Sequence, residues 1–240
     1  MKRRARIQFA VVTVLVVVVG YLYWVQNVQA PIATPATAPA VEQKTPQSMV
    51  LPVPFVYEAP RGNFSGPWKN GCEEAAIVMV DAYYKGERVV PVEVAEQRMR
   101  VLFEAQDKKW GSNANSDAAR TAELIRGLAL FEARVVEAPT LEQIRAEIIG
   151  GRPVISLHRG FELGNSNIRF LATGSSYHMV VVVGYDDNTG EFIVQDTGDA
   201  QAGENRRYTY AVLLNSVHDY NYKTAKADGP ARVIFTKPNE

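Results

Sequence analysis

The pattern of hydrophobic and polar positions divides the chain into three parts. Residues 7–25 are uncharged and largely apolar, residues 26–49 are rich in Pro, Ala and Thr, and apolar positions recur in short periodic runs from residue 50 onward. An apolar run of the first kind is long enough for a helix to cross a bilayer. The pattern therefore predicts a membrane anchor at 7–25, a semi-extended linker at 26–49 and a folded domain at 50–240.

Four basic residues precede the apolar run, within residues 1–6. Basic flanks stay on the cytoplasmic side of a membrane, so we expect a single-pass protein whose C-terminal domain is extracytoplasmic and whose N-terminal helix contacts the lipid bilayer. A cleaved signal peptide is the alternative, because small residues lead up to Ala30. Pro31 at the next position disfavours cleavage there.

Helical periodicity dominates the first half of the folded domain. A Gly, Asn and Pro rich stretch is followed at Cys72 by apolar residues at helical spacing, which predicts a loop that feeds a buried helix. Further helices are predicted over 92–104, over 116–130 with Ser116 as N-cap, and over 140–149 with Thr140 as N-cap.

Strand patterns dominate the second half. FEARVVEA predicts a short strand, and β-branched runs follow after Pro153, namely VISLH, YHMVVVVGYDD, EFIVQD and RVIFT. Helices followed by a mostly antiparallel sheet predict an α+β domain, with the functional site where the first helix meets the sheet.

Charge and cysteine content narrow the function classes. Lys plus Arg and Asp plus Glu both number 26, so the net charge gives no electrostatic support for a nucleic-acid partner. Cys72 is the one cysteine, which leaves two interpretations, a small buried hydrophobic residue or a reactive nucleophile. One Cys and three scattered His lack ligand-pair spacing, so the sequence predicts no metal site.

A nucleophilic thiol needs an imidazole and a third polar group that orients the imidazole. His178 begins one strand run and Asp196 lies on the next, with a DDNTG turn between them. A loop centred on Asp187 places the two directly opposite each other, and one centred on Asn188 makes them diagonal neighbours on the same face. A two-residue loop would place them on opposite faces.

The first turn of the Cys72 helix also contains Glu73 and Glu74. A helix N-terminus lowers the pKa of a thiol, and two glutamates oppose that effect. We interpret at least one of them as an ordinary N-terminal helix charge.

Five segments resemble a known family, namely VPFVYEAP, PWKNGCEEAAIVMVDAYY, GRPVISLHRGFELGN, YHMVVVVGYDDNTGEFIVQDTGD and VLLNSVHDYN. Together they resemble the papain-superfamily cysteine peptidases related to the bacteriocin-processing, double-glycine leader peptidases. The resemblance implies a papain-like fold and no cofactor. It also implies hydrolysis of peptide bonds through a thioester, with Cys72 as nucleophile, His178 as general base and acid, and Asp196 orienting the imidazole.

Two departures from that family stand out. Relatives usually carry Gln where this chain has Glu58, and a carboxylate cannot donate a hydrogen bond to an oxyanion unless it is protonated. The donor can come from three sources. These are a Glu58 kept neutral by burial, a backbone N–H near Cys72, or a side chain such as Asn63 or Asn70. The second departure is Thr197, where relatives usually have Pro.

Two aromatic residues, Trp68 and Tyr177, are candidate substrate-binding residues, although Trp68 also fits a packing role beside the helix start. The HDYN block with His218 and Asp219 is interpreted as a local turn. Two other functions stay open. A cell-wall amidase or transpeptidase would use the same three catalytic residues, and a non-catalytic papain-like module would bind peptides or scaffold an envelope complex.

Overall fold

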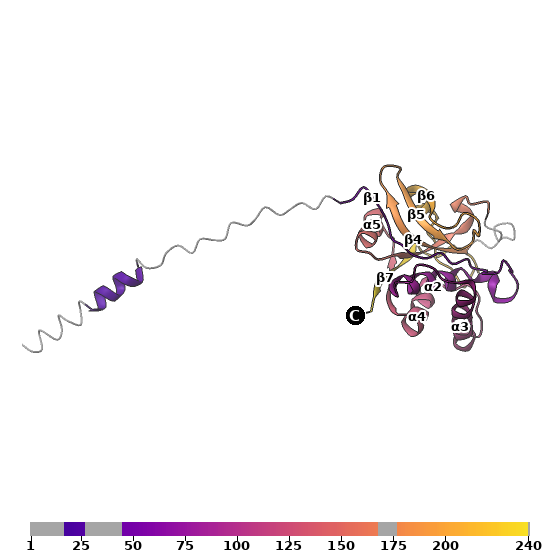
Figure 1. Ribbon diagram of the computed structural model, residues 1–240, viewed down its shortest axis with the longest axis horizontal. Coiled ribbons are helices and arrows are strands. Elements are labelled where there is room, and N and C mark those ends of the chain that lie inside the picture. Colours follow the sequence, from indigo (N-terminus) through magenta and orange to yellow (C-terminus); the bar gives the residue numbers. More distant parts are fainter. Residues whose placement is uncertain (1–16, 27–44, 168–176, 240) are drawn as a thin grey trace, which may run out of the picture. The chain divides into compact units, whose positions relative to one another are not determined.

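The computed structural model describes residues 17–26, 45–167 and 177–239 (Figure 1). The chain forms two compact units, Met1–Thr45 and Pro46–Glu240. In the first unit, residues 17–26 are helical with exposed side chains. None of the helices in the described ranges is long and apolar enough to span a bilayer. The first part of the predicted anchor and most of the predicted linker lie outside the described residues.

The second unit contains every labelled helix and strand. These elements are β1 Ser48–Val50, η1 Gly66–Asn70, α2 Cys72–Tyr84, α3 Val92–Trp110, α4 Ala118–Leu128, β2 Phe131–Glu137, α5 Leu141–Ile149, β3 Val154–Arg159, η2 Gly160–Leu163, β4 Tyr177–Asp186, β5 Glu191–Asp196, β6 Arg206–Thr209, α6 Tyr210–Ser216 and β7 Arg232–Pro238. All the predicted helices and strands of this unit are present. The short elements β1, β6, α6, η1 and η2 were not predicted, because so few residues leave no periodicity to read.

The strands form one antiparallel sheet with the order β2-β7-β3-β4-β5-β6. β1 extends the same sheet by pairing with the last residues of β4, so the sheet includes residues that the composition assigned to the linker. Helices α2, α3 and α4 gather along one side of the sheet, and α5 lies apart from them near β1 (Figure 1). The predicted α+β architecture is confirmed.

Two helix starts were predicted from capping residues, and the structure corrects one of the two N-caps. Thr140 is the N-cap of α5, as predicted, and its side chain accepts a hydrogen bond from the Gln143 backbone. The two residues form a complete capping box, which was not predicted. The N-cap of α4 is Asp117 and not Ser116, because the Asp117 side chain accepts from the Arg120 backbone at 2.8 Å. Ser116 is buried one residue earlier, where its backbone is used at the candidate site.

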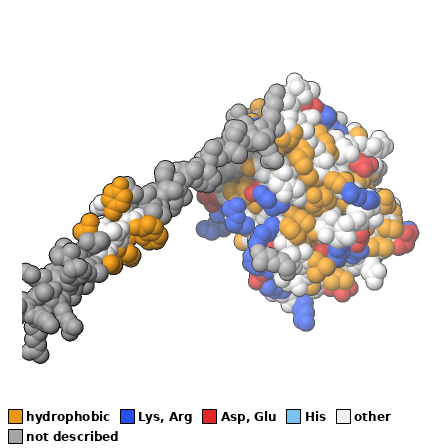
Figure 2. Space-filling model, turned by 60° about the vertical axis from the view of Figure 1, so that its left-hand side comes forward, with side chains coloured by type: hydrophobic (Ala, Val, Ile, Leu, Met, Phe, Trp, Pro, Cys, Tyr) orange, Lys and Arg blue, Asp and Glu red, His pale blue; other side chains and the backbone are white. Residues whose placement is uncertain are grey.

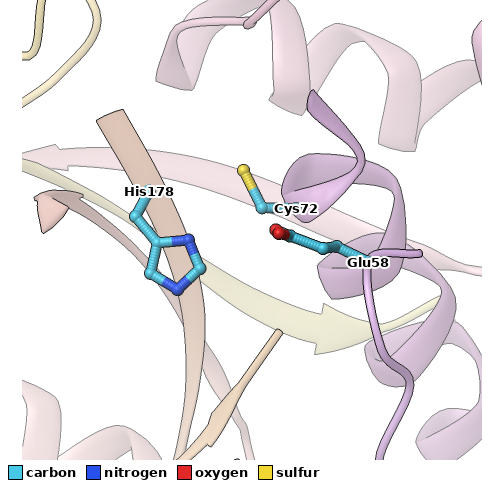
Figure 3. A group of neighbouring side chains, drawn as sticks. All are labelled: Glu58, Cys72 and His178. Atoms are coloured by element: carbon cyan, nitrogen blue, oxygen red, sulfur yellow. The ribbon is translucent and has the colours of Figure 1, made fainter. Parts of the chain in front are cut away.

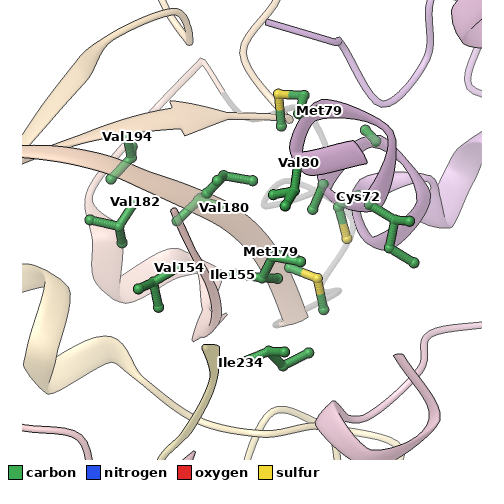
Figure 4. Close-up of a cluster of buried hydrophobic side chains, with 14 of the residues drawn as sticks. Cys72, Met79, Val80, Val154, Ile155, Met179, Val180, Val182, Val194 and Ile234 are labelled. Carbon is green, nitrogen blue, oxygen red and sulfur yellow. The ribbon is translucent and has the colours of Figure 1, made fainter. Parts of the chain in front are cut away.

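The core of the unit forms where α2 packs against β4. Every residue of α2 from Cys72 to Ala82 is buried, which is the pattern of a helix surrounded by protein and not of an amphipathic surface helix. Met79 and Val80 of this helix and Met179 and Val180 of β4 belong to one cluster of buried hydrophobic side chains (Figure 4). On the face drawn in Figure 2, by contrast, hydrophobic and charged side chains of the folded unit are interspersed.

The β4–β5 hairpin changes register at a β-bulge. Residues 184–186 pair with residues 191–193 near the turn, and the register shifts by one at Val183. Without that shift, His178 and Asp196 would lie on opposite faces of the sheet, since one residue of slip reverses every side chain. With it, Asp196 pairs with the second residue after His178, so the two are diagonal neighbours on one face.

Gly71→Ala tests how tightly the start of α2 is held. A Cβ at Gly71 would lie 2.4 Å from the backbone oxygen of Glu58, so the Glu58 segment would have to move. We expect a loss of about 1–3 kcal/mol in unfolding free energy, the usual cost of overpacking a core. Urea denaturation of the 46–240 fragment measures it. Gly127→Ala in α4, with nothing within 4 Å of the added Cβ, is the control and should be neutral or stabilising. Equal stability of the two variants would contradict the prediction.

Candidate active site

Three side chains from distant parts of the sequence converge at the N-terminus of α2. The Sγ atom of Cys72, a carboxyl oxygen of Glu58 and a ring nitrogen of His178 lie within 4.8 Å of one another. They come from the first residue of α2, the segment before η1 and the start of β4 (Figure 3). Their exposed fractions are 3%, 1% and 0%, so the cluster is closed to solvent.

Asp196 lies on the other side of the His178 ring. Its Oδ1 atom and the Nε2 atom of His178 are hydrogen-bonded at 2.7 Å. The second ring nitrogen, Nδ1, lies on the side of the ring that faces Cys72 (Figure 3). The structure therefore brings together the Cys, His and Asp residues that the sequence proposed as a unit.

Three further donors hold the Asp196 carboxylate. Tyr208 donates its hydroxyl to Oδ2 at 2.6 Å, Asn165 donates to Oδ2 at 3.1 Å, and the Gly198 backbone donates to Oδ1 at 3.2 Å. Burial opposes ionisation of Asp196, but His178 and these hydrogen bonds outweigh it and hold the pKa well below its usual range. Sequence reasoning missed Tyr208 and Asn165, since neither belongs to a pattern that points to Asp196.

Thr197 connects the Asp196 loop to the segment that carries Glu58. The Glu58 backbone N–H donates to the Thr197 carbonyl at 2.9 Å, and the Thr197 hydroxyl donates to the Met179 carbonyl at 2.8 Å. A proline at this position would still offer the carbonyl to Glu58. The departure from the family pattern at Thr197 therefore preserves the contact that positions Glu58.

Glu58 is a buried acid whose carboxyl group is difficult to ionise. Burial raises its pKa well above the usual range, and the nearby Asp196 and Glu73 carboxyls raise it further. A neutral carboxyl group has an O–H donor. The first of the three sources proposed for an oxyanion donor, a Glu58 kept neutral by burial, therefore has a physical basis.

The Cys72 thiol donates a hydrogen bond to Glu73 Oε2 at 3.0 Å. Burial raises the pKa of the thiol well above its usual range, and any ionisation of the neighbouring Glu73 or Glu58 carboxyl would raise it further. The sequence argument that a helix N-terminus lowers this pKa is corrected here, because burial and the neighbouring acids outweigh the helix dipole. Glu73 and Glu74 are each only 1% exposed, so neither is an ordinary surface charge of a helix start.

Glu73 is part of a buried network that also includes Tyr177. The Ser116 backbone N–H donates to Glu73 Oε1 at 2.7 Å, and the Ser116 carbonyl accepts from the Tyr177 hydroxyl at 2.7 Å. Burial raises the pKa of Glu73 to about 7, while the hydrogen bonds from Cys72 and Ser116 limit the rise. The hydroxyl of Tyr177, a candidate substrate-binding residue, therefore has its hydrogen-bond partner within the protein.

The remaining candidate residues lie in and beside η1. Asn63 is exposed, and its side-chain oxygen accepts from the Ser65 backbone in a local turn. Asn70 is half-buried at the end of η1, two residues before the thiol. Trp68 is buried and packs edge-on against Phe103, with ring centroids 5.2 Å apart, which matches the packing role.

His158 and the HDYN block, which contains His218, have structural contacts. His158 pairs with His178 across β3 and β4, and its Nδ1 atom is hydrogen-bonded to the Ser216 hydroxyl at 2.9 Å. Burial, with a contribution from His178, lowers the pKa of His158 to about 3. In the HDYN block, Asp219 accepts from the Ala118 backbone at 3.0 Å and so supports the start of α4.

A separate cavity of about 880 Å³ opens at the far end of α2 from Cys72. Its walls include Tyr83 and Tyr84 of α2, Arg152 and Phe235. None of the candidate catalytic residues lines it. The thiol chemistry therefore belongs to the closed cluster at the start of α2, and not to this larger cavity.

Comparisons with known sequences and structures bear on the family and the fold. The sequence pattern of the Peptidase C39-like family matches residues 50–227, which include the whole cluster. The chain belongs to this family. A crystal structure described as a C39-like peptidase from Bacillus anthracis is similar to it, with a TM-score of 0.51 at 13% identity, covering 80% of this chain and 98% of that one. Curated proteins gave no match to the sequence.

The family and the structural likeness confirm the papain-like α+β fold that the sequence resemblance implied. At 13% identity the structural likeness concerns the fold alone. The family match indicates the cysteine peptidase class. The roles of individual residues rest on the geometry of this chain.

The raised pKa of Glu73 predicts how stability depends on pH. The unfolded chain releases this proton near pH 4.5, whereas the folded protein holds it to about pH 7. The protonated Glu73 carboxyl therefore contributes its full stabilisation of the folded state below pH 4.5, and this contribution is lost as pH rises through 7. The shift corresponds to a loss on the order of 3 kcal/mol. Glu73→Gln removes the ionisable carboxyl group. The unfolding free energy of the variant, compared with that of wild type at the same pH, should therefore rise by that amount between pH 4 and pH 8.

Urea denaturation at several pH values measures this difference. Glu104→Gln, at an exposed position of α3, is the control and should leave the pH profile as in wild type. A Glu73→Gln profile parallel to that of wild type would show that Glu73 ionises equally in both states.

Proposed function

We propose that the folded domain is a cysteine peptidase that hydrolyses a peptide bond in a peptide or protein substrate. Cys72 is the nucleophile, His178 the general base and then acid, and Asp196 orients the imidazole. The observation that carries this proposal is the His178 ring, hydrogen-bonded to Asp196 on one side and facing Cys72 on the other. Membership of the Peptidase C39-like family supports it.

The reaction proceeds in two halves. Nδ1 of His178 takes the thiol proton while Cys72 Sγ attacks the carbonyl carbon, and the imidazolium is stabilised by the Asp196 carboxylate. The O–H of neutral Glu58 donates to the oxyanion. His178 then returns the proton to the leaving amine, which leaves a thioester on Cys72. A water molecule, deprotonated by His178, hydrolyses the thioester and restores the thiol.

The resting state holds the thiol in a protected form. Cys72 is neutral, hydrogen-bonded to Glu73 and only 3% exposed. Substrate binding therefore has to open the site and turn the thiol from Glu73 toward His178. The proton transfer then accompanies the attack on the substrate, in place of a preformed thiolate and imidazolium pair.

Two other functions are compatible with the same cluster. A cell-wall amidase or transpeptidase would use the same thioester and differ in the substrate or the acceptor. A non-catalytic peptide-binding module is favoured by the raised thiol pKa and by Glu58 in place of an amide.

Alkylation of Cys72 by iodoacetamide as a function of pH separates an active thiol from an idle one. If Cys72 and His178 act together, His178→Ala should slow labelling at neutral pH, because the imidazole no longer accepts the thiol proton. Cys72→Ala should keep the fold and lose at least ~10³-fold in turnover of a peptide-library substrate. Circular dichroism checks the fold of both variants.

Labelling that is slow and equal in wild type and His178→Ala would favour the non-catalytic module over the peptidase. Near wild-type turnover in Cys72→Ala would exclude thiol catalysis. Mass spectrometry of the products formed from peptidoglycan fragments distinguishes a peptidase from an amidase or transpeptidase.

We also propose that residues 7–25 anchor the chain in a membrane, with the folded domain outside the cytoplasm. The uncharged apolar run and its basic flank support this topology. Protease added to intact cells, after any outer barrier is permeabilised, should remove the domain. Protection of the domain would contradict the topology, and a mature chain that begins at Pro31 would favour the cleaved signal peptide.

A further inference from the structure

The three converging side chains offer a zinc-type set of ligand atoms. Thiolate sulfur, imidazole nitrogen and carboxylate oxygen are the three side-chain donors that Zn²⁺ takes in proteins. In a tetrahedral zinc site such atoms are about 3.3–3.8 Å apart, given the usual bond lengths. The ligand atoms of Glu58, Cys72 and His178 already lie within 4.8 Å of one another, so small side-chain rotations complete the geometry.

Glu58 gives an independent indication of a ligand. Its Oε1 atom is buried and has no hydrogen-bond partner among the described residues. The carboxyl group points into the space between the thiol and the imidazole (Figure 3). A buried polar atom without a partner is costly, and a bound cation would satisfy it.

The described groups around the cluster are acidic and contain no competing cation. Three buried carboxyl groups lie near the thiol, those of Glu58, Glu73 and Glu74. Among the described ion pairs, none joins a Lys or Arg to any of these three, and Asp196 is paired with His178. A divalent cation that replaces the protons of Cys72 and Glu58 would therefore be compensated by its own two anionic ligands, without displacing a basic side chain.

The imidazole is already oriented for coordination. His178 is hydrogen-bonded through Nε2 to Asp196 at 2.7 Å, and Asp196 is held in turn by Tyr208. A carboxylate behind a histidine fixes the ring and strengthens it as a metal ligand. Nδ1 is thereby presented toward Cys72 and Glu58.

We propose that Glu58, Cys72 and His178 bind one zinc-class divalent cation, through Oε, Sγ and Nδ1. The thiol proton of Cys72 and the carboxyl proton of Glu58 leave as the ion binds, and water fills the fourth position. Coordination lowers the nucleophilicity of the thiolate and occupies the His178 nitrogen that serves as the base, so the ion is a reversible inhibitor of the proposed peptidase. Binding itself does not rest on that function; only the inhibitory effect does. The family resemblance and the sequence pattern did not indicate this site.

Cobalt titration of the purified full chain tests the site, because Co²⁺ bound to a thiolate gives a near-ultraviolet charge-transfer band. Wild type should bind one Co²⁺ with this band, and Zn²⁺ should displace it. Glu58→Gln keeps the shape and removes the anionic ligand, so its affinity should fall by at least the ~10–100-fold that loss of a supporting carboxylate costs. Glu74→Gln, a buried glutamate outside the ligand set, is the matched control and should bind as wild type does.

Absence of the band in wild type, or an unchanged affinity in Glu58→Gln, would overturn the site. If Glu58→Gln fails to fold, Asp196→Asn takes its place, with an expected ~10–100-fold loss of affinity through the imidazole. Cys72 alkylation in chelator-treated protein reports on the peptidase separately. His178-dependent labelling without a cobalt band would support the peptidase and reject the metal site. A cobalt band with labelling that does not depend on His178 would reject the peptidase alone.

Discussion

The hydrogen bond between His178 and Asp196 is the contact on which the site depends. It joins two adjacent strands on one face of the sheet, and it exists because a bulge at Val183 restores the register that the turn alone would have lost. Through Thr197, the same loop fixes the backbone of Glu58. One local irregularity in β4 therefore positions the base, its orienting acid and the candidate oxyanion donor together.

The second constraint is electrostatic. The domain buries Glu58, Glu73 and Glu74 around a thiol at a helix start, where a helix dipole favours negative charge. Burial dominates that effect and raises the pKa of the three acids and of the thiol. The cluster costs stability as pH rises, and it keeps Cys72 protected until something else enters the site.

Glu58 connects catalysis with metal binding. As a neutral acid it has the O–H that an oxyanion needs, and as an anion it is the third ligand that a divalent cation needs. A glutamine at this position could serve the first purpose and would be a poor ligand for the second. The departure from the usual family residue thus adds a chemical option and need not mark a decayed enzyme.

The sequence by itself determined the elements with clear periodicity, the helix that begins at Cys72, and the Cys, His and Asp order of the site. Those features follow from local spacing, turn residues and short stretches of chain, which act without distant partners. Tertiary structure decided the bulge at Val183, the donors Tyr208 and Asn165, and the burial of Glu73 that reversed the expected thiol pKa. Register, hydrogen-bond partners and desolvation depend on which segments meet in space, and no local pattern in a single sequence carries that information.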